Sequence, residues 1–319
     1  MPKWESDDSL TTRSVISTIS NQGRLDKVNQ YKIIKIIGQG SFGKVFLSKD
    51  CNTGKKRALK ILDRKMISWT LINKTQTAEA AVRKEIAIMK KLKHPNVVKL
   101  VEVIDQEDDD AIYLVMEYAG KHSLQAKMKK SKIPSVYIWN YFRDALRGLL
   151  YCHEEAGVVH RDIKPENLLI TKDNRIKIAD FGCSVIIQNG SKDLENTVGS
   201  NYFFSPEITQ GVTHEGKPSD VWALGVTLYL MLFGEYPFQA PSNEYQILYR
   251  RIQNEEPYYP VDFEDKDAID LLKQIFIKDP KLRITLKQIK THSWVTASGK
   301  FPLADKEEQL SNDDSQVEA

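Results

Sequence analysis

Cysteine is scarce in this 319-residue sequence, which has three, and Cys51, Cys152 and Cys183 lie far apart. An odd and dispersed set predicts neither a disulfide framework nor a zinc site. Apolar runs are short, and none approaches the roughly 18 residues that a membrane-spanning helix requires. The net charge of +3 is small and the basic residues form no stripe. Neither a membrane nor a nucleic acid is therefore expected as a partner.

Both ends of the chain have the composition of solvated segments. Residues 1–30 open on an acidic, polar stretch that does not resemble a signal peptide, and Pro2 stands where N-myristoylation needs glycine. We therefore expect a flexible N-terminal tail and a cytoplasmic protein. Residues 297–319 are rich in Asp and Glu and predict an acidic C-terminal tail.

The central part of the chain changes from strand-like to helix-like patterns near residue 120. This change predicts an α+β protein, with a small β-rich lobe over residues 31–119 and a larger helical lobe over residues 120–296. The predicted strands are Tyr31–Ile37, Val45–Asp50, Lys56–Leu62, Val98–Ile104 and Ala111–Glu117, and the predicted helices are Thr77–Leu92, Val136–His153, Val221–Phe233, Ser242–Gln253 and Asp267–Ile277.

A glycine-rich segment follows the first predicted strand and consists of Gly38, Gln39, Gly40, Ser41, Phe42, Gly43, Lys44 and Val45. Glycines let a backbone fold tightly over phosphates and offer its N–H groups without obstruction by a Cβ atom. The same spacing fits a dinucleotide-binding fingerprint, but that motif requires a helix directly after the glycines. Because Val45–Asp50 has a strand pattern instead, we predict a hairpin that covers a bound nucleotide.

Lys60 lies on a predicted strand between small and apolar residues, so we expect its ammonium group to point into a cleft. A cation in such a place requires a counter-charge, and Glu85 on the predicted helix is the candidate. The pair would hold the lysine against the α- and β-phosphates of ATP. Taken alone, Glu85 also fits an ordinary solvated helix residue.

The segment from His160 to Asn167 reads His-Arg-Asp-Ile-Lys-Pro-Glu-Asn, and Asp180 opens a later Asp-Phe-Gly. Asp162 is predicted to orient an attacking hydroxyl group, and Lys164 to neutralise charge on the transferred phosphoryl group. Asn167 and Asp180 offer the hard oxygen ligands that Mg²⁺ prefers. A loop of solvated charges is the simpler alternative, and the presence of all these elements in one order argues against it.

Together these motifs resemble the eukaryotic protein kinase superfamily over residues 31–296. Lys164, two residues after Asp162, resembles the serine/threonine branch of that superfamily. The resemblance implies the two-lobed protein kinase fold, ATP as the phosphoryl donor and Mg²⁺ as the metal ion. It also implies that Ser200 touches Asp162 and Lys164.

Two structural contacts and the adenine site are implied by the same resemblance. Glu207 is expected to pair with Arg283, and Asp220 to brace the catalytic loop. The backbone of the hinge Glu117–Ala119, which includes Ala119, is expected to bind adenine. The apolar residues expected around the ring are Ile37, Val45, Ala58, Leu169 and the gatekeeper Met116, each of which also fits an ordinary core position. Cys183 either faces the nucleotide or is a buried, inert thiol.

A narrower resemblance is to the calcium/calmodulin-dependent protein kinase kinases and their fungal relatives, carried by residues 85–103, 176–182, 196–199 and 292–296. It implies protein substrates that include the activation loops of other kinases, with AMP-activated-type kinases as expected partners. The interval from Lys60 to Glu85 lacks the Arg/Pro-rich insert of that group. The chain also ends soon after residue 296, so calmodulin control is not expected.

A pseudokinase-like scaffold is the alternative function, and it predicts the loss of Lys60, Asp162 or Asp180, all of which are present. In many kinases an arginine at the position of Arg161 binds a phosphate on the activation loop. The usual phosphorylated position is Asn196, which cannot be phosphorylated, while Thr197 lies one residue out of register. We therefore predict that activity does not require activation-loop phosphorylation.

Overall fold

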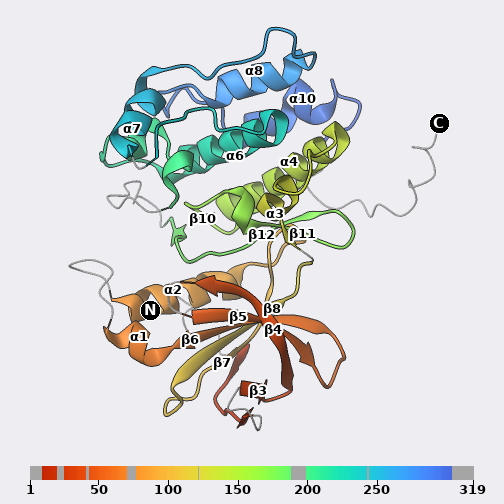
Figure 1. Cartoon of the computed structure of the whole chain (residues 1–319), viewed down its shortest axis with the longest axis vertical. Helices are drawn as coiled ribbons and strands as arrows, with labels where there is room; N and C mark the ends of the chain where they lie inside the picture. Colours follow the sequence, from red (N-terminus) through yellow and green to blue (C-terminus); the bar gives the residue numbers. More distant parts are fainter. Residues whose placement is uncertain are drawn as a thin grey trace, which may run out of the picture.

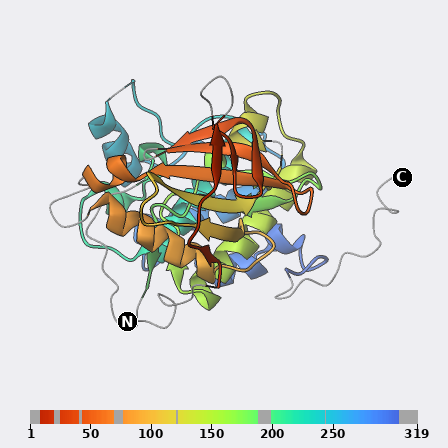
Figure 2. The same cartoon turned by 90° about the horizontal axis from the view of Figure 1, so that it is seen from below.

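The computed structural model describes residues 9–19, 25–40, 43–69, 77–120, 122–187, 199–242 and 244–303. These residues form a sheet lobe and a larger helical lobe (Figure 1). Figure 2 looks onto the sheet lobe, with the helical lobe behind it. The predicted two-lobed α+β architecture is confirmed. No helix in the described ranges has both the length and the apolar character that crossing a membrane requires.

The sheet lobe contains eight strands in the order β1-β7-β8-β6-β5-β4-β3-β2, and neighbouring strands are antiparallel except for β1 and β7. Five strands had been expected, and β4 to β8 match them. The strands are β1 (Thr11–Thr12), β2 (Ser17–Ile19), β3 (Leu25–Val28), β4 (Tyr31–Gly40), β5 (Gly43–Asp50), β6 (Lys56–Asp63), β7 (Leu100–Ile104) and β8 (Ala111–Glu117).

Strand β8 is a nearly continuous apolar run because both of its faces are covered. Ile112 and Leu114 point to the face that packs on helix α2, whereas Tyr113 and Val115 point to the opposite face. That opposite face is covered by the chain before β4, through residues such as Val28.

The chain before Tyr31 corrects one expectation, because residues 9–19 and 25–30 do not form a tail. They supply β1, which pairs with β7 at one edge, and β3, which pairs with β4 at the other edge and carries β2 beyond it. The C-terminal end differs in a smaller way: Leu303 is buried, and Arg143 donates to the carbonyl oxygen of Phe301 at 2.7 Å. Residues 304–319 lie outside the described ranges.

Helix α2 (Ala78–Lys91) follows the predicted limits closely. Thr77 caps its first turn by accepting a hydrogen bond from the N–H of Ala80. Its buried face includes Val82 and Met89, which are seven residues or two helical turns apart, and packs on the sheet. A second short helix, α1 (Arg64–Trp69), precedes it and was not predicted.

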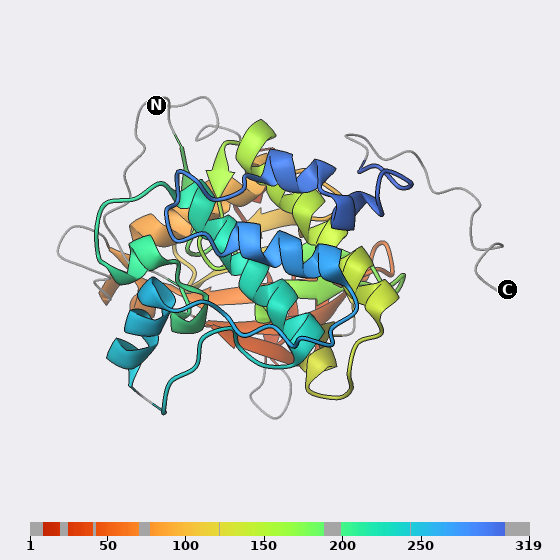
Figure 3. The same cartoon turned by 90° about the horizontal axis from the view of Figure 1, so that it is seen from above.

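The helical lobe is built around α6, which is buried on nearly all sides, as expected for a helix with apolar residues all round (Figure 3). Three predicted helices appear as α4, α7 and α8 with ends shifted by a few residues. The helices are α3 (Leu124–Met128), α4 (Ser135–Leu150), the π-helix η1 (Tyr151–Glu155), α5 (Pro206–Thr209), α6 (Gly216–Phe233), α7 (Tyr245–Asn254), α8 (Lys266–Ile275), α9 (Leu286–Thr291) and α10 (Ser293–Thr296).

The helical lobe also contains short strands: β9 (His122–Ser123), β10 (Val158–Val159), β11 (Leu168–Ile170), β12 (Ile176–Ile178) and β13 (Val185–Ile186). The segment after α2 is attached to β12. The N–H of Val98 donates to the carbonyl oxygen of Ile178, and the N–H of Ile178 donates to that of Asn96, both at 2.8 Å. The side-chain amide of Asn96 donates to Ile176 at 2.8 Å. Gly148 lies beneath this contact, where a Cβ atom would be 2.9 Å from the Asn96 oxygen.

Candidate active site

The glycine-rich segment forms a hairpin between β4 and β5, in which Gly40 pairs with Gly43. Ser41 and Phe42, between these two glycines, lie outside the described residues. Strand β5 follows directly, so the predicted hairpin is confirmed and the dinucleotide fingerprint is excluded. A larger residue does not fit at position 43 without moving the backbone, because a Cβ atom on Gly43 would lie 1.8 Å from the carbonyl oxygen of Ile61 on β6.

Lys60 and Glu85 form the predicted ion pair, with Nζ of the lysine 2.6 Å from Oε1 of the glutamate. The contact joins β6 to the buried side of α2. Burial opposes the charge of Lys60, but the carboxylates of Glu85 and Asp180 outweigh it and raise the pKa of the lysine. Its ammonium group therefore stays charged and suits a phosphate ligand.

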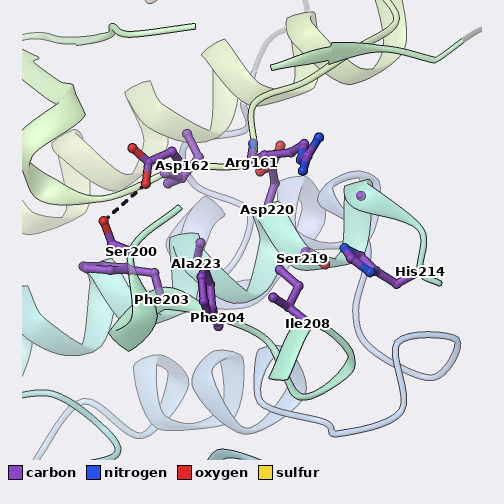
Figure 4. A pocket seen from close by; sticks show the side chains of 12 residues that line it. Arg161, Asp162, Ser200, Phe203, Phe204, Ile208, His214, Ser219, Asp220 and Ala223 are labelled. Carbon is purple, nitrogen blue, oxygen red and sulfur yellow. Dashed lines mark hydrogen bonds between the residues drawn. The ribbon is translucent and has the colours of Figure 1, made fainter. Parts of the chain in front are cut away.

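Three polar side chains surround Asp162: Lys164 and Asn167 of the catalytic loop (residues 160–167), and Ser200 from a later segment. Lys164 Nζ lies 2.7 Å from Oδ2 of Asp162 and donates a hydrogen bond of 2.8 Å to the hydroxyl of Ser200. That hydroxyl donates in turn to Oδ1 of Asp162 at 3.3 Å, the dashed line in Figure 4. Nδ2 of Asn167 donates to the main-chain carbonyl and to Oδ2 of Asp162, at 2.8 and 3.0 Å. The predicted contacts of Ser200 are confirmed, and the Asp162 carboxylate is held in one orientation.

Asp180 follows β12 in a left-handed backbone conformation, with a φ of 64°. The next residue, Phe181, is fully buried, and its ring lies edge-on to that of His160 with the ring centres 4.9 Å apart. His160 donates through Nε2 to the carbonyl oxygen of Ala179 and accepts through Nδ1 from the N–H of Asp162, at 3.1 and 3.3 Å. Phe181 and His160 therefore fix the position of Asp180 relative to the catalytic loop.

Asp220 of α6 braces the catalytic loop, as predicted: its carboxylate accepts hydrogen bonds of 2.8 Å from the N–H groups of His160 and Arg161. Burial favours the neutral form of Asp220, but its hydrogen bonds outweigh burial and hold its pKa below the usual value. A third donor, Nε2 of His153 at 2.8 Å, had not been predicted. His153 lies on the π-helix that ends α4. A π-helix turn often marks a functional site, but no local sequence pattern indicates one here.

A small cavity of about 20 Å³ lies beneath the catalytic loop, where Figure 4 shows Ser200, Phe204 and Ala223 around it. This volume holds about one water molecule and is too small for a nucleotide or a peptide. The cavity therefore belongs to the packing of the segment after Ser200 against α6.

The residues predicted to line an adenine site come from adjacent strands. Val45 on β5 pairs with Lys60 on β6, and Ala58, two residues earlier on β6, pairs with Met116 on β8. Residues two apart on a strand share one face of the sheet. Ala58 therefore lies on the same face as Lys60, whose ammonium group is expected to hold phosphate.

The hinge from Glu117 to Ala119 leads closely past β11. A Cβ atom on Gly120 would lie 2.0 Å from the carbonyl oxygen of Ile170, so a larger residue does not fit there without displacing the backbone. Leu169 is the neighbour of Ile170 on β11 and is partly buried. Ile37 is exposed on β4 in the sheet lobe. Contact of these residues with adenine stays a prediction.

Asn167 and Asp180 fit the donor chemistry of a magnesium site. Because Nδ2 of Asn167 donates to Asp162, the carbonyl oxygen of this amide is turned away from Asp162 and suits a metal ligand. Asp180 adds carboxylate oxygens. Within the described ranges, no three or more His, Cys, Asp or Glu residues are grouped to hold a metal ion. Mg²⁺ commonly binds one or two protein oxygens together with phosphate oxygens and water, so this pair fits an ion that binds together with a nucleotide.

Comparisons with known proteins agree with this geometry. The family model described as Protein kinase domain matches residues 31–295. Calcium/calmodulin-dependent protein kinase kinase of Caenorhabditis elegans is 37% identical over 302 residues, covering 88% of this chain and 55% of that protein. Serine/threonine-protein kinase ssp1 of Schizosaccharomyces pombe is 41% identical over 300 residues, covering 90% of this chain and 45% of that protein. Serine/threonine-protein kinase GRIK1 of Arabidopsis thaliana is 36% identical over 270 residues, covering 84% of this chain and 67% of that protein.

The fold and the site define a protein kinase domain, and this chain belongs to that family. Its relatives in animals, fungi and plants are named as serine/threonine kinases or as a protein kinase kinase, so the domain is of the serine/threonine type. The chain spans about half the length of the animal and fungal relatives.

Proposed function

We propose that this chain transfers the terminal phosphoryl group of ATP to Ser or Thr residues in the activation loops of other kinases, in the presence of Mg²⁺. The observation that carries the proposal is the joint presence of the Lys60–Glu85 pair and the Asp162–Lys164–Ser200 cluster. A pseudokinase-like scaffold has no need to keep both arrangements. Phosphoryl transfer relies mainly on positioning and electrostatics, which these contacts supply.

In this mechanism Asp162 accepts a hydrogen bond from the substrate hydroxyl and aligns it with the terminal phosphate. Its carboxylate is oriented for that role by Asn167 and Ser200. Lys164 lies beside Asp162 and neutralises charge on the transferred group, while Lys60 holds the nucleotide phosphates. Mg²⁺, held by Asn167 and Asp180, would neutralise charge on the phosphate oxygens.

The choice of other kinases as substrates rests on resemblance. The Caenorhabditis elegans relative is named as a kinase of a protein kinase, and AMP-activated-type kinases are the partners that we propose. A cytoplasmic location is proposed from the composition of the chain. Asn196 and Thr197 lie outside the described residues, so independence from activation-loop phosphorylation stays a prediction.

The test is transfer of labelled phosphate from ATP to a catalytically inactive AMP-activated-type kinase domain. Asp162→Asn should lower kcat about 100- to 10,000-fold and leave the KM for ATP nearly unchanged, because Asp162 contacts the hydroxyl and not the nucleotide. Asp173→Asn, on an exposed turn, is the matched control and should behave as wild type. Absence of transfer by the wild-type chain, or equal rates for Asp162→Asn and wild type, would favour the scaffold.

A further inference from the structure

The N-terminal strand β1 connects the edge of the sheet to helix α2. The N–H of Val103 donates to the carbonyl oxygen of Leu10 at 2.7 Å, and the N–H of Asp105 donates to that of Thr12 at 2.9 Å. At the same place Lys90, in the last turn of α2, donates a hydrogen bond of 2.9 Å to the hydroxyl of Thr11. A strand of two residues thus contacts the helix that carries Glu85.

Thr11 and Thr12 have partners of opposite charge. Successive side chains of a strand point to opposite faces, and here Thr11 faces the ammonium group of Lys90. Thr12 instead donates its hydroxyl proton to Oε1 of Glu102 at 2.5 Å. A negative charge added to either threonine would therefore have opposite consequences.

Three neutral groups donate hydrogen bonds to the carboxylate of Glu102. Its Oε2 accepts from the hydroxyl of Tyr31 at 2.5 Å and from Nε2 of Gln30 at 3.1 Å, while Oε1 accepts from Thr12. Burial, together with the adjacent Glu102, raises the pKa of Tyr31, so its hydroxyl remains a donor at neutral pH. The neighbouring Arg13 is directed to Asp105, 3.7 Å away. A second anion beside Glu102 would thus meet repulsion at close range.

We propose that Thr12 is a phosphorylation site whose modification detaches β1 from the sheet and weakens its hold on α2. In this step the bond between the terminal phosphorus atom of ATP and its bridging oxygen breaks. A new bond forms between that phosphorus atom and Oγ1 of Thr12. ADP leaves, and the hydroxyl proton passes to the aspartate base of the transferring serine/threonine kinase. The product has lost the O–H that bound Glu102 and faces that carboxylate with its own negative charge.

Access to Thr12 follows from the size of β1. A two-residue strand at the edge of a sheet opens at low free-energy cost, because few backbone hydrogen bonds hold it. Once phosphorylated, the opened form is the favoured one. The contact between Lys90 and Thr11 is then lost with the strand, and the end of α2 loses a support five residues after Glu85. A weaker Lys60–Glu85 pair should raise the KM for ATP.

Hydrogen exchange of the full-length chain tests this directly, because the N–H groups of Val103 and Asp105 are protected by β1. Thr12→Glu should speed their exchange about tenfold or more and raise the KM for ATP several-fold. Thr12→Val removes the hydroxyl without adding charge and should have a smaller effect. Thr11→Glu is the matched control: its carboxylate faces Lys90, so exchange at both amides should stay equal or become slower.

A second experiment uses the phosphorylated protein itself. A chain with phosphothreonine incorporated at position 12 should show the same faster exchange, while the amides of α6 keep their protection because the helical lobe remains folded. Wild-type exchange rates at Val103 and Asp105 in this chain would overturn the proposal. So would equal effects of Thr11→Glu and Thr12→Glu, since that result would show simple disruption of the strand rather than a response to charge.

Discussion

Arg283 donates two parallel hydrogen bonds to the carboxylate of Glu207, from Nη1 to Oε1 at 2.7 Å and from Nη2 to Oε2 at 2.9 Å. Both side chains are buried. Burial favours the neutral form of Glu207, but the hydrogen bonds from Arg283 outweigh it and keep the pKa of the glutamate below its usual value. The pair ties the segment that follows Ser200 to the C-terminal part of the helical lobe, as the kinase resemblance implied.

Replacing the arginine should be costly, because it leaves a buried carboxylate without its counter-charge. Arg283→Met is expected to lower the free energy of unfolding by about 3–5 kcal/mol, measured by urea denaturation. Arg283→Lys keeps the charge but not the planar fork and should fall between this variant and wild type. Lys281→Met, at an exposed position two residues away, is the control. An Arg283→Met variant as stable as this control would contradict the assignment.

The glycine-rich hairpin allows a second test of close packing. Gly43→Ala places a Cβ atom 1.8 Å from the carbonyl oxygen of Ile61, so β5 and β6 must separate. We expect a loss of about 1–3 kcal/mol in unfolding free energy, together with a higher KM for ATP. At Gly38 an added Cβ atom would make an ordinary contact of 3.6 Å with Val45. Gly38→Ala should therefore leave the thermal midpoint nearly unchanged, and equal midpoints for the two variants would refute the argument.

His94 should make stability depend on pH. Burial, together with the nearby cations Lys177 and Arg147, lowers the pKa of His94 from 6.5 to about 4. Between these two values the unfolded chain binds a proton that the folded chain does not, so stability falls as the pH decreases from 6.5 towards 4. The expected loss is about 3 kcal/mol, since a difference of one pKa unit corresponds to about 1.4 kcal/mol.

Chemical denaturation at several pH values measures this slope. His94→Asn keeps an acceptor for the N–H of Asn96, which Nδ1 of His94 now binds at 3.1 Å, but does not titrate in this range. Its unfolding free energy should be lower at all pH values, because the stacking on Tyr151 is lost, and should vary less between pH 6.5 and 4. If the unfolding free energy of His94→Asn depended on pH as steeply as that of wild type, other groups would be the cause of the pH dependence.

Cys183 is predicted to be a poor nucleophile at neutral pH, although it follows Asp180-Phe181-Gly182. Burial, reinforced by the carboxylates of Asp162 and Asp180, raises its pKa to about 11. Compared with a thiol of pKa 9, the thiolate fraction at pH 7.5 is about 100-fold smaller. In a Cys51→Ser chain, which lacks the exposed cysteine, alkylation of Cys183 by iodoacetamide should be slow at pH 7.5. Its rate should still be rising at pH 10, and a plateau near pH 8 would show that the thiol is not shielded.

The contacts that could be predicted are those in which the charge of one residue requires a particular kind of partner. Lys60 needs a counter-charge, and Glu85 on the following helix was the candidate, so the 2.6 Å pair was foreseeable. The order of charged residues around Asp162 likewise predicted a loop of the protein kinase type. The partners of Glu207 and Asp220 came from family resemblance, because no local pattern links positions so far apart in the chain.

Other features depend on tertiary context that a sequence pattern does not contain. Thr11 and Thr12 have no apolar alternation; they form a strand because the edge of β7 offers unpaired N–H groups. His153 could not be connected to Asp220, because the connection depends on a π-helical turn at the end of α4. The expected tail at residues 1–30 was wrong for residues 9–19 and 25–30 for the same reason: their partner surface lies elsewhere in the sequence.

The segments that flank β7 and β8 join the sheet lobe to the helical lobe. Asn96 and Val98 form hydrogen bonds with Ile178, and Gly120 passes close to Ile170. In the strand order, β4 and β5 lie farther across the sheet from these contacts than β7 and β8 do. We therefore expect any rigid-body displacement of the sheet lobe to move the glycine-rich hairpin farther than it moves β7 and β8.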